Sequence, residues 1–225
     1  MRNICIIPAR GGSKRIPHKN IRSFLGKPII AYSIEAAINS RCFDEIMVST
    51  DDEEIAQIAK QYGAKVPFMR SEKTSNDHAT LADVIKEVLK EYSDAGVIFD
   101  NMCCILATSP LLRSDDIIAG YKKLLDSNFT SIVPIVQYSY PIQRSLILDK
   151  AGIVSYKWPE YSKSRSQDLE PTYHDAGTFY WHVIRNWISG DIRRGAVVVD
   201  EMSVQDIDTE RDWEMAEFKY RMQFK

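Results

Sequence analysis

A short loop near the start of the chain gathers the residue types that bind phosphate. Residues 8–20 read PARGGSKRIPHKN, with two adjacent glycines and four fixed cations, Arg10, Lys14, Arg15 and Lys19. Glycines let a backbone turn and approach a ligand without a Cβ in between, and guanidinium and ammonium groups suit a di- or triphosphate. The loop directly follows the apolar run Ile4–Ile7, which is typical of a buried strand. We therefore interpret it as a phosphate-binding loop and not as a solvated basic surface loop.

A pair of carboxylates, Asp206 and Asp208, stands just before a predicted helix near the other end of the sequence. If this segment is extended, both carboxylates point to one face, because side chains alternate along a strand. Mg²⁺ takes one or two carboxylates together with phosphate oxygens and water. An Asp-x-Asp at a helix start can also serve only as a cap, but together with the basic loop it predicts a Mg²⁺ site.

Two common nucleotide-binding patterns are missing from the loop. The Walker pattern ends in Gly-Lys-Ser/Thr, and the dinucleotide fingerprint requires Gly-x-Gly-x-x-Gly. Residues 8–20 contain neither. The kinase and dehydrogenase hypotheses therefore lose their main support.

The composition is that of an ordinary globular protein. The 225 residues are 44% hydrophobic and carry a net charge of −2, which suits one domain with a substantial core and argues against a nucleic-acid or membrane-surface protein. We expect no signal peptide and no membrane span, because the apolar run after Met1 is short and no segment approaches the ~20 apolar residues of a span. The four cysteines lack metal-ligand spacing, so we expect reduced core thiols in a cytoplasmic protein.

Strand-like and helix-like segments alternate over the first 135 residues. Apolar runs predict strands at 4–7, 46–50, 102–106 and 131–135, and helical periodicity predicts helices at 55–62, 81–92 and 114–125. This alternation predicts an α/β fold with a mostly parallel central sheet covered by helices on both faces. Ligands bind outside the carboxyl ends of such strands, where the loop at 8–20 also lies.

The alternation breaks between about residues 137 and 176. This segment is rich in tyrosine, contains three prolines, and includes apolar runs at 146–148 and 153–155 that predict a hairpin. Aromatic residues next to arginines suit an interface or a ligand lid; the alternative is a plain surface excursion. After it, the pattern predicts strands at 178–182 and 196–199 and a last helix from Thr209, whose Thr-x-x-Asp spacing is similar to a capping box.

The loop at 8–20 closely resembles the nucleotide-binding signature of the cytidylyltransferases that activate nonulosonic acids, a family that includes the synthetases of CMP-sialic acid. The resemblance covers essentially the whole chain and continues in VSTD at 48–51, RSE at 70–72, TSPL at 108–111, RSQD at 165–168 and DIDT at 206–209. The run Ser166–Trp181 is most similar to the branch of the family that acts on pseudaminic acid, and YPIQR at 140–144 supports this.

The resemblance implies one three-layer nucleotidyltransferase domain over residues 1–225, with an insertion at about 137–176 for dimerisation and sugar binding. The implied reaction joins CTP to the sugar's anomeric hydroxyl and releases pyrophosphate, supplying CMP-sugars for cell-surface glycans and flagellin glycosylation. Arg10, Lys14 and Lys19 would be catalytic, and Asp206 and Asp208 would hold Mg²⁺. The implied nucleotide-binding residues are Ala9, Arg10, Gly11, Gly12, Ser13, Lys14, Lys19, Asn20, Arg70 and Thr80.

The sugar site is implied to include Leu106, Arg144, Arg165, Gln167, Tyr173, His174 and Asp175. Sialic acid synthetases typically have Gln where this chain has Leu106, and an apolar residue suits a 9-deoxy tail such as that of pseudaminic or legionaminic acid. Sialic acid is therefore the less favoured substrate. The family's dimers exchange the inserted segment, so we expect a homodimer in which Arg144 or its neighbours reach the partner's site.

Two alternative functions, each from another class of protein, remain open. A metal-dependent glycosyltransferase also uses an Asp-x-Asp site, although there it normally lies mid-domain. A non-catalytic nucleotide-binding protein would normally have lost part of the set of cations and carboxylates, which this chain keeps. Pyrophosphate release from CTP would separate both from the cytidylyltransferase reading.

Overall fold

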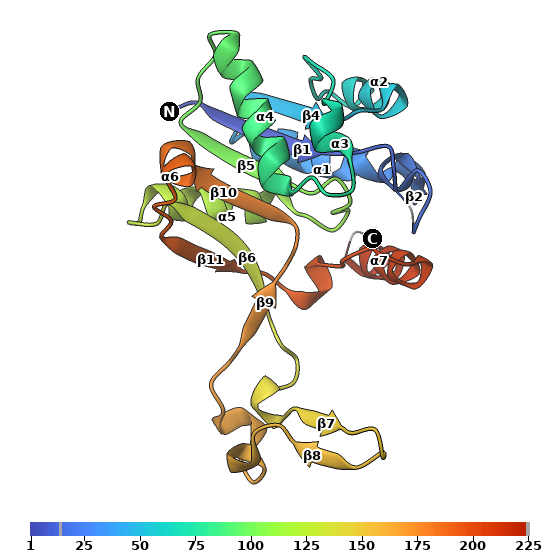
Figure 1. Ribbon diagram of the computed structural model, residues 1–225, viewed down its shortest axis with the longest axis vertical. Helices are drawn as coiled ribbons and strands as arrows, with labels where there is room; N and C mark the ends of the chain where they lie inside the picture. Colours follow the sequence, from blue (N-terminus) through green and yellow to red (C-terminus); the bar gives the residue numbers. More distant parts are fainter. Residues whose placement is uncertain (14, 224–225) are drawn as a thin grey trace.

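The computed structural model describes residues 1–13 and 15–223, so Lys14 lies outside the described residues. Its centre is a seven-stranded sheet in the order β11-β6-β10-β5-β1-β4, with β9 paired to β6 (Figure 1). The strands are β1 (Asn3–Pro8), β4 (Glu45–Ser49), β5 (Asn101–Ile105), β6 (Ser131–Gln137), β9 (Tyr173–Asp175), β10 (Phe179–Val183) and β11 (Arg194–Val198).

Most strands of this sheet run in one direction. β1 is parallel to both β4 and β5, and β6 is parallel to β11. β10 runs antiparallel between β5 and β6. β9 also runs antiparallel to β6. The predicted α/β fold with a mostly parallel sheet is therefore confirmed, and the reversed strand β10 carries residues from the C-terminal half into the middle of the sheet.

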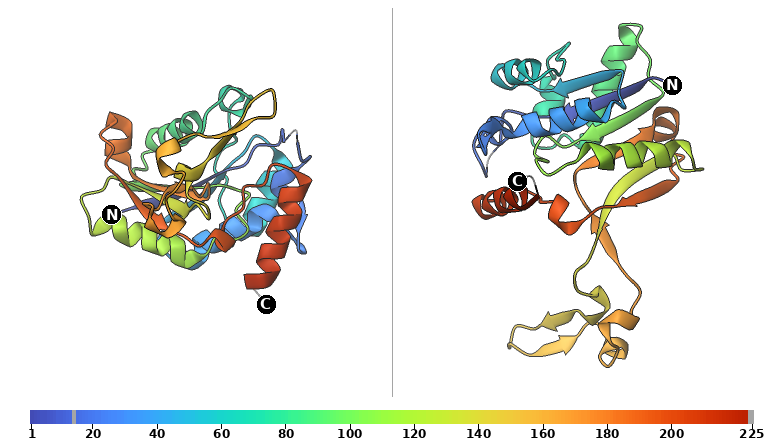
Figure 2. Two further views of the ribbon diagram at one scale, coloured as in Figure 1. Left: turned by 90° about the horizontal axis from the view of Figure 1, so that it is seen from below. Right: turned by 180° about the vertical axis from the view of Figure 1, so that it is seen from behind.

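Helices cover both faces of the sheet because successive strand side chains point to opposite sides. Cys5 and Ile7 pack in the cluster that contains α1 (Ile29–Ser40), α2 (Glu53–Gln61) and α5 (Ser114–Leu125), which lie in front in the right-hand view of Figure 2. The opposite face packs on α4 (Leu81–Asp94) and α6 (Ile184–Ser189), which lie in front in Figure 1.

The cysteines follow the same alternation. Cys103 packs in the first of these clusters and its neighbour Cys104 in the second, and all four cysteines are free thiols. Burial raises the pKa of Cys104 to about 12. Three of them are buried in the core and Cys42 is half-buried, and none belongs to a metal-binding cluster within the described residues.

The C-terminal helix α7 (Glu210–Gln223) packs beside the segment that follows the N-terminal loop (Figure 1). Its Trp213 meets the Phe24 ring edge-on, with the ring centroids 5.6 Å apart, and the Arg22 guanidinium lies 4.5 Å from the Trp213 ring centroid. This packing brings the segment before α7, which contains the two predicted metal ligands, next to the predicted phosphate loop. The remaining short elements are β2 (Ser23–Phe24), β3 (Lys27–Pro28), α3 (Glu72–Ser75) and the 3₁₀ turns Lys19–Ile21, Ile142–Arg144, Pro159–Tyr161, Ser166–Asp168 and Glu201–Ser203.

Residues 138–172, here called the extension, leave the sheet between β6 and β9 and stand well apart from it (Figures 1 and 2). The Tyr138 amide donates to the Thr172 carbonyl at the base, with 2.9 Å between nitrogen and oxygen. Further out, β7 (Leu146–Leu148) and β8 (Val154–Tyr156) form a separate antiparallel pair whose residues are all exposed. Within the described residues, no helix has the length and apolar character needed to cross a bilayer.

Candidate active site

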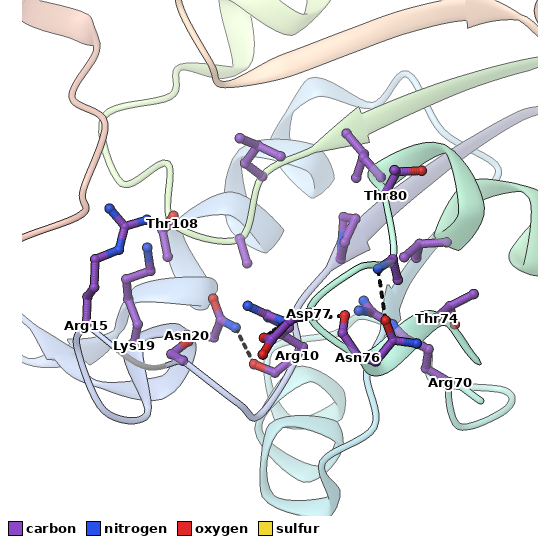
Figure 3. Close-up of a pocket in the computed structure, with 17 residues that line it drawn as sticks. Arg10, Arg15, Lys19, Asn20, Arg70, Thr74, Asn76, Asp77, Thr80 and Thr108 are labelled. Atoms are coloured by element: carbon purple, nitrogen blue, oxygen red, sulfur yellow. Dashed lines mark hydrogen bonds and ion pairs between the residues drawn. The ribbon is translucent and has the colours of Figure 1, made fainter. Parts of the chain in front are cut away.

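A cavity of about 590 Å³ opens where β1 and β5 end at the carboxyl edge of the sheet (Figure 3). Three segments line it: the loop after β1, residues 70–84, and the segment that follows β5. The structure brings together here the predicted residues Arg10, Ser13, Lys19, Asn20, Arg70, Thr80 and Leu106. We call it the first cavity.

The loop after β1 is fixed from two sides. The Gly11 amide donates to Asp51 Oδ1 (3.0 Å), and Asn20 Nδ2 donates to the Arg10 carbonyl (2.8 Å). A Cβ on Gly11 would lie 2.6 Å from Asp52 Oδ2, whereas one on Gly12 would meet nothing within 4 Å. Neither glycine has a positive φ. Glycine is thus required at position 11 by the close approach of Asp52, and Gly12 faces open space.

The cations of this loop face carboxylates from other parts of the chain. Arg10 pairs with Asp77 at 2.9 Å between Nη1 and Oδ1, and Arg15 pairs with Asp208 at 2.8 Å. Lys19, which runs beside Arg15 in Figure 3, donates to the Ile207 carbonyl (2.6 Å) and lies 3.7 Å from Asp208. Three loop cations therefore line the cavity, and each of them faces a carboxylate of the same chain, Asp77 or Asp208.

Arg70 and Thr80 are held on the opposite wall. Arg70 is buried, and its guanidinium donates to the hydroxyl and the carbonyl of Ser49 at the end of β4. Burial lowers the pKa of Arg70, although it remains a cation. Thr80 forms a capping box with Asp83 at the start of α4, so the N-terminus of a 14-residue helix borders the cavity. The positive end of that helix dipole adds to the field of the cations.

Of the two predicted metal ligands, Asp206 and Asp208, the second lies against Arg15 and Lys19, which line the first cavity. Ile207 between the two aspartates is 1% exposed and packs against α7, whereas Asp206 and Asp208 both reach the surface. Asp212 Oδ2 accepts hydrogen bonds from the amides of Asp208 (3.1 Å) and Thr209 (2.8 Å), which fixes the backbone there.

These residues fit a Mg²⁺ that is completed by a ligand's phosphates. The two carboxylates supply hard oxygen donors, and no cluster of three or more His, Cys, Asp or Glu that could hold a metal by protein groups alone occurs in the described part of the chain. One or two carboxylates plus phosphate oxygens and water is the usual arrangement for this ion.

A second cavity, of about 520 Å³, adjoins the first and shares Leu81 with it. The predicted residues Tyr173, His174 and Asp175 line it. The other lining residues come from the sheet face and two helices: Ala82, Ile85, Cys104, Val133, Ile135, Tyr180, His182, Trp187 and Arg194.

Two of these side chains have strongly shifted pKa values. Burial, then the charge of Asp175, raises the pKa of Tyr180, whose hydroxyl donates to Asp175 Oδ1 at 3.1 Å; a smaller contribution comes from Asp206. The predicted metal ligand therefore acts electrostatically on the second cavity as well. Burial lowers the pKa of His182 to about 4, assisted by the nearby charge of Arg194, so this imidazole is neutral at pH 7.

Three predicted sugar residues lie in the extension and line neither of these cavities. Gln167 borders a separate hollow of about 300 Å³ there. Arg144 donates to Ser166 Oγ (3.4 Å), and Arg165 pairs with Asp168 (2.7 Å). Within one chain the extension holds these residues away from the two cavities (Figure 1).

Sequence reasoning missed several residues that line the cavities. Tyr180 and His182 could have been found from strand alternation, because they point away from the buried Phe179 and Trp181. Asp77, Trp187 and Arg194 lie outside any motif, and only the fold brings them to the cavities.

A family model described as Cytidylyltransferase matches residues 4–151. The chain belongs to the cytidylyltransferase family. This confirms the predicted family and the predicted enzyme class, a nucleotidyltransferase that uses CTP.

Two similar proteins show which members of the family this cytidylyltransferase resembles in sequence. It is 43% identical over 226 residues to the pseudaminic acid cytidylyltransferase of Campylobacter jejuni, covering 99% of this chain and 97% of that protein. It is 40% identical over 137 residues to the CMP-N,N'-diacetyllegionaminic acid synthase of Legionella pneumophila, covering 60% of this chain and 59% of that one.

A solved structure supports the fold. CMP:2-keto-3-deoxy-manno-octonic acid synthetase, solved in complex with CTP, superposes on this cytidylyltransferase with a TM-score of 0.73 over all of both chains, at 19% identity. At that identity the likeness concerns the fold alone.

Proposed function

We propose that this cytidylyltransferase couples CTP to a nonulosonic acid, most favourably pseudaminic acid. The anomeric hydroxyl of the sugar would attack the α-phosphorus of CTP; a new oxygen–phosphorus bond forms as the bond to the β-phosphate oxygen breaks, and pyrophosphate leaves. The observation that carries the proposal is the junction of the two cavities at Leu81, with cations on one side and Tyr173 and Asp175 on the other. The full-length likeness to a pseudaminic acid cytidylyltransferase supports the choice of sugar.

In the first cavity, Arg10 and Lys19 would exchange their carboxylate partners for the β- and γ-phosphates. Lys14 is proposed to join them on the strength of its place in the loop. Phosphoryl-type transfer depends on positioning and on neutralising charge, and this arrangement supplies both without a covalent intermediate. Asn20, Arg70 and Thr80 would hold the cytidine end of CTP.

Asp206 and Asp208 would hold Mg²⁺ at the rim between the two cavities. Bound there, the ion would neutralise phosphate charge and favour ionisation of a coordinated hydroxyl. When it binds, Asp208 would release Arg15, which would then be available to the triphosphate. The hydrogen bonds from the amides of Asp208 and Thr209 to Asp212 would keep the carboxylates in place during this exchange.

The second cavity would take the sugar, next to the rim carboxylates. Tyr173, His174 and Asp175 line it, and its walls are largely apolar. By likeness to the relative named for N,N'-diacetyllegionaminic acid, we expect a sugar with acetylated amino groups. Leu106, which lines the first cavity, would contact the sugar's deoxy terminus.

The proposed enzyme is a homodimer. Exposed apolar side chains gather on the extension, among them Tyr140 at 84% and Leu148 at 69% exposure, and a second copy is the commonest cover for such a surface. Arg144, Arg165 and Gln167 would then reach the partner's sugar site. Light scattering at micromolar concentration tests this: we expect twice the chain mass, and a fully active monomer would contradict it. The cytoplasmic location stays a prediction.

Pyrophosphate release from CTP, measured against a panel of nonulosonic acids, tests the reaction. We expect release that requires both sugar and Mg²⁺, with pseudaminic acid preferred and sialic acid poor. Reactions without sugar, or with UTP in place of CTP, are the controls. Release of CMP from a CMP-sugar would instead indicate a glycosyltransferase, and CTP binding without turnover on any sugar would indicate a non-catalytic nucleotide-binding protein.

A further inference from the structure

One carboxylate of α4 holds a wall of the first cavity without lining it. Glu87 Oε1 accepts a hydrogen bond from the Ser71 amide (2.8 Å), and Oε2 accepts from the hydroxyls of Ser71 (2.8 Å) and Thr74. Thr74 and Arg70 both line the first cavity, on the same side in Figure 3, whereas Glu87 lines neither cavity. The carboxylate therefore ties residues 70–74 to α4.

The acceptor in these hydrogen bonds is charged. Burial by itself raises the pKa of Glu87, but the hydrogen bonds from Thr74 and Ser71 outweigh it and lower the pKa, so the group is a carboxylate at pH 7. Hydrogen bonds to an ionised acceptor are stronger than those between neutral groups. Without the carboxylate, the buried Thr74 would lose this acceptor, which is costly. Residues 70–74 should then shift towards other partners.

Arg70 depends on the position of this segment. It is buried, and its guanidinium donates to the hydroxyl and the carbonyl of Ser49. Burial lowers the pKa of Arg70, and the charges of Asp51 and Glu87 oppose that effect. Glu87 therefore acts on Arg70 in two ways: it fixes the adjacent residue, Ser71, and it favours the charge of the guanidinium.

We infer that Glu87 is a positioning residue that keeps Arg70 where it selects CTP over UTP. This inference rests on the part of the proposed function that places the cytidine end of CTP at Arg70. It assigns a share of nucleotide selection to a side chain that itself touches neither substrate.

The two pyrimidine bases differ in what they offer to a guanidinium. Cytosine has hydrogen-bond acceptors at both O2 and N3, whereas uracil has an acceptor at O2 and a donor at N3. A guanidinium only donates, and the bonds of Arg70 to Ser49 use only part of its donors. A donor held opposite N3 therefore matches cytosine and is opposed by the N3–H of uracil.

This discrimination depends on where the guanidinium is held. A donor that moves from N3 to O2 meets an acceptor in both bases and no longer distinguishes them. Displacement of Arg70 should therefore weaken the binding of CTP more than the binding of UTP. A role of Glu87 in the stability of the fold alone would weaken both nucleotides to the same extent.

The test measures nucleotide binding and turnover separately. Calorimetry with Mg²⁺ and without sugar gives the dissociation constants of CTP and UTP, and pyrophosphate release with pseudaminic acid gives KM and kcat for CTP. The variants are Glu87→Ala and Glu87→Gln, of which the second keeps an acceptor for the Ser71 amide. Glu91→Ala is the matched control, because Glu91 is an exposed glutamate about one turn further along α4. Thermal melting shows whether each variant is folded.

We expect the wild type to bind CTP more tightly than UTP. Glu87→Ala should raise the dissociation constant and the KM for CTP by about tenfold, with a smaller change for UTP and little change in kcat. Glu87→Gln should change the preference in the same direction by less, and Glu91→Ala should match the wild type. In an Arg70→Lys background, Glu87→Ala should change the preference little further, because both substitutions act through one group.

Equal weakening of CTP and UTP in Glu87→Ala, or an undiminished effect in the Arg70→Lys background, would overturn the inference. If Glu87→Ala does not fold, an unchanged preference in Glu87→Gln would overturn it instead. A wild type that binds CTP and UTP equally would also overturn it. A wild type that prefers CTP but releases no pyrophosphate with any nonulosonic acid would overturn the proposed reaction and leave the role of Glu87 in nucleotide binding intact.

Discussion

The two cavities share Leu81 but are built on opposite principles. In the first, the described cations face carboxylates: Arg10 meets Asp77, and Arg15 and Lys19 meet Asp208. In the second, Arg194 lacks a partner within the described residues and a neutral histidine lies beside it. The loop cations of the first cavity already have carboxylate partners within the chain, whereas the second cavity keeps a guanidinium without such a partner among the described residues, beside apolar walls.

This difference indicates how the work is divided. A ligand of the first cavity must displace ion pairs. Only a multiply charged group, such as a triphosphate with its metal, forms interactions strong enough to compensate for their loss. A ligand of the second cavity displaces water from apolar surface and from one guanidinium, which rewards shape and hydrogen-bonding pattern. Changes in the first cavity should therefore affect turnover of every substrate, and changes in the second should affect the choice between substrates.

The largest effect is expected from Arg10→Ala. Loss of one preorganised charge that stabilises the leaving pyrophosphate should lower kcat by ~10²–10³-fold, equally for all accepted sugars. Stopped pyrophosphate assays measure this, with Lys60→Ala, a change at an exposed residue of α2, as the control. A folded Arg10→Ala variant with unchanged kinetics would remove the triphosphate from the first cavity.

The rim carboxylates should come next. Asp208→Asn should leave a folded protein that needs far more Mg²⁺ for half-maximal activity, because it loses a charged oxygen ligand, and Asp206→Asn should behave similarly. Excess chelator should abolish activity in the wild type. Mg²⁺ titrations like that of the wild type in both variants, or turnover in chelator, would reject the metal site.

A smaller effect is expected at Leu106, which lines the first cavity and not the second. If it contacts the sugar's deoxy terminus, Leu106→Gln should lower kcat/KM for a 9-deoxy sugar by roughly 1–3 kcal/mol, since an unpaired polar group replaces an apolar contact. Comparing kcat/KM on pseudaminic and sialic acid checks it. If the ratio of kcat/KM between the two sugars is unchanged in Leu106→Gln, then Leu106 does not recognise the sugar's tail, and residues of the second cavity alone do so.

How much of this could be predicted from the sequence differs between elements. Helices with one apolar face, such as α4, follow from periodicity, and the helix predicted at 55–62 is α2, which Asp52 caps. The helix α1 left no such pattern, because nine of its twelve residues are buried and its apolar residues run nearly all round. The antiparallel direction of β10 could not be predicted either, because apolar and polar side chains alternate in the same way along parallel and antiparallel strands.

In the candidate site too, some residues could be predicted from the sequence and others only from the fold. The loop cations of the first cavity come from one contiguous segment and stand out as a motif, whereas Asp77, on another segment that lines the cavity, does not. The second cavity is assembled from separate strands and helices, and Arg194 joins it only through the register of β11 with β6.

The last prediction tests the neutrality of the second cavity through stability and not through turnover. The pKa of His182 is lowered to about 4 in the folded protein, mainly by burial and then by Arg194, against about 6.5 in an unfolded chain. Between these pH values the unfolded chain binds more protons than the folded one, so stability falls as the pH falls through this window. His182→Gln removes this proton uptake. Its melting temperature relative to the wild type should therefore rise progressively from pH 7 to pH 4 and stay constant above pH 7.

Melting curves across this range, with the exposed His78→Gln as the control, measure the effect. A parallel pH dependence in wild type and His182→Gln would mean that His182 titrates normally in the folded protein. The second cavity would then carry a cation pair below about pH 6.5. The contrast with the first cavity, whose loop cations pair with carboxylates, depends on this imidazole staying neutral.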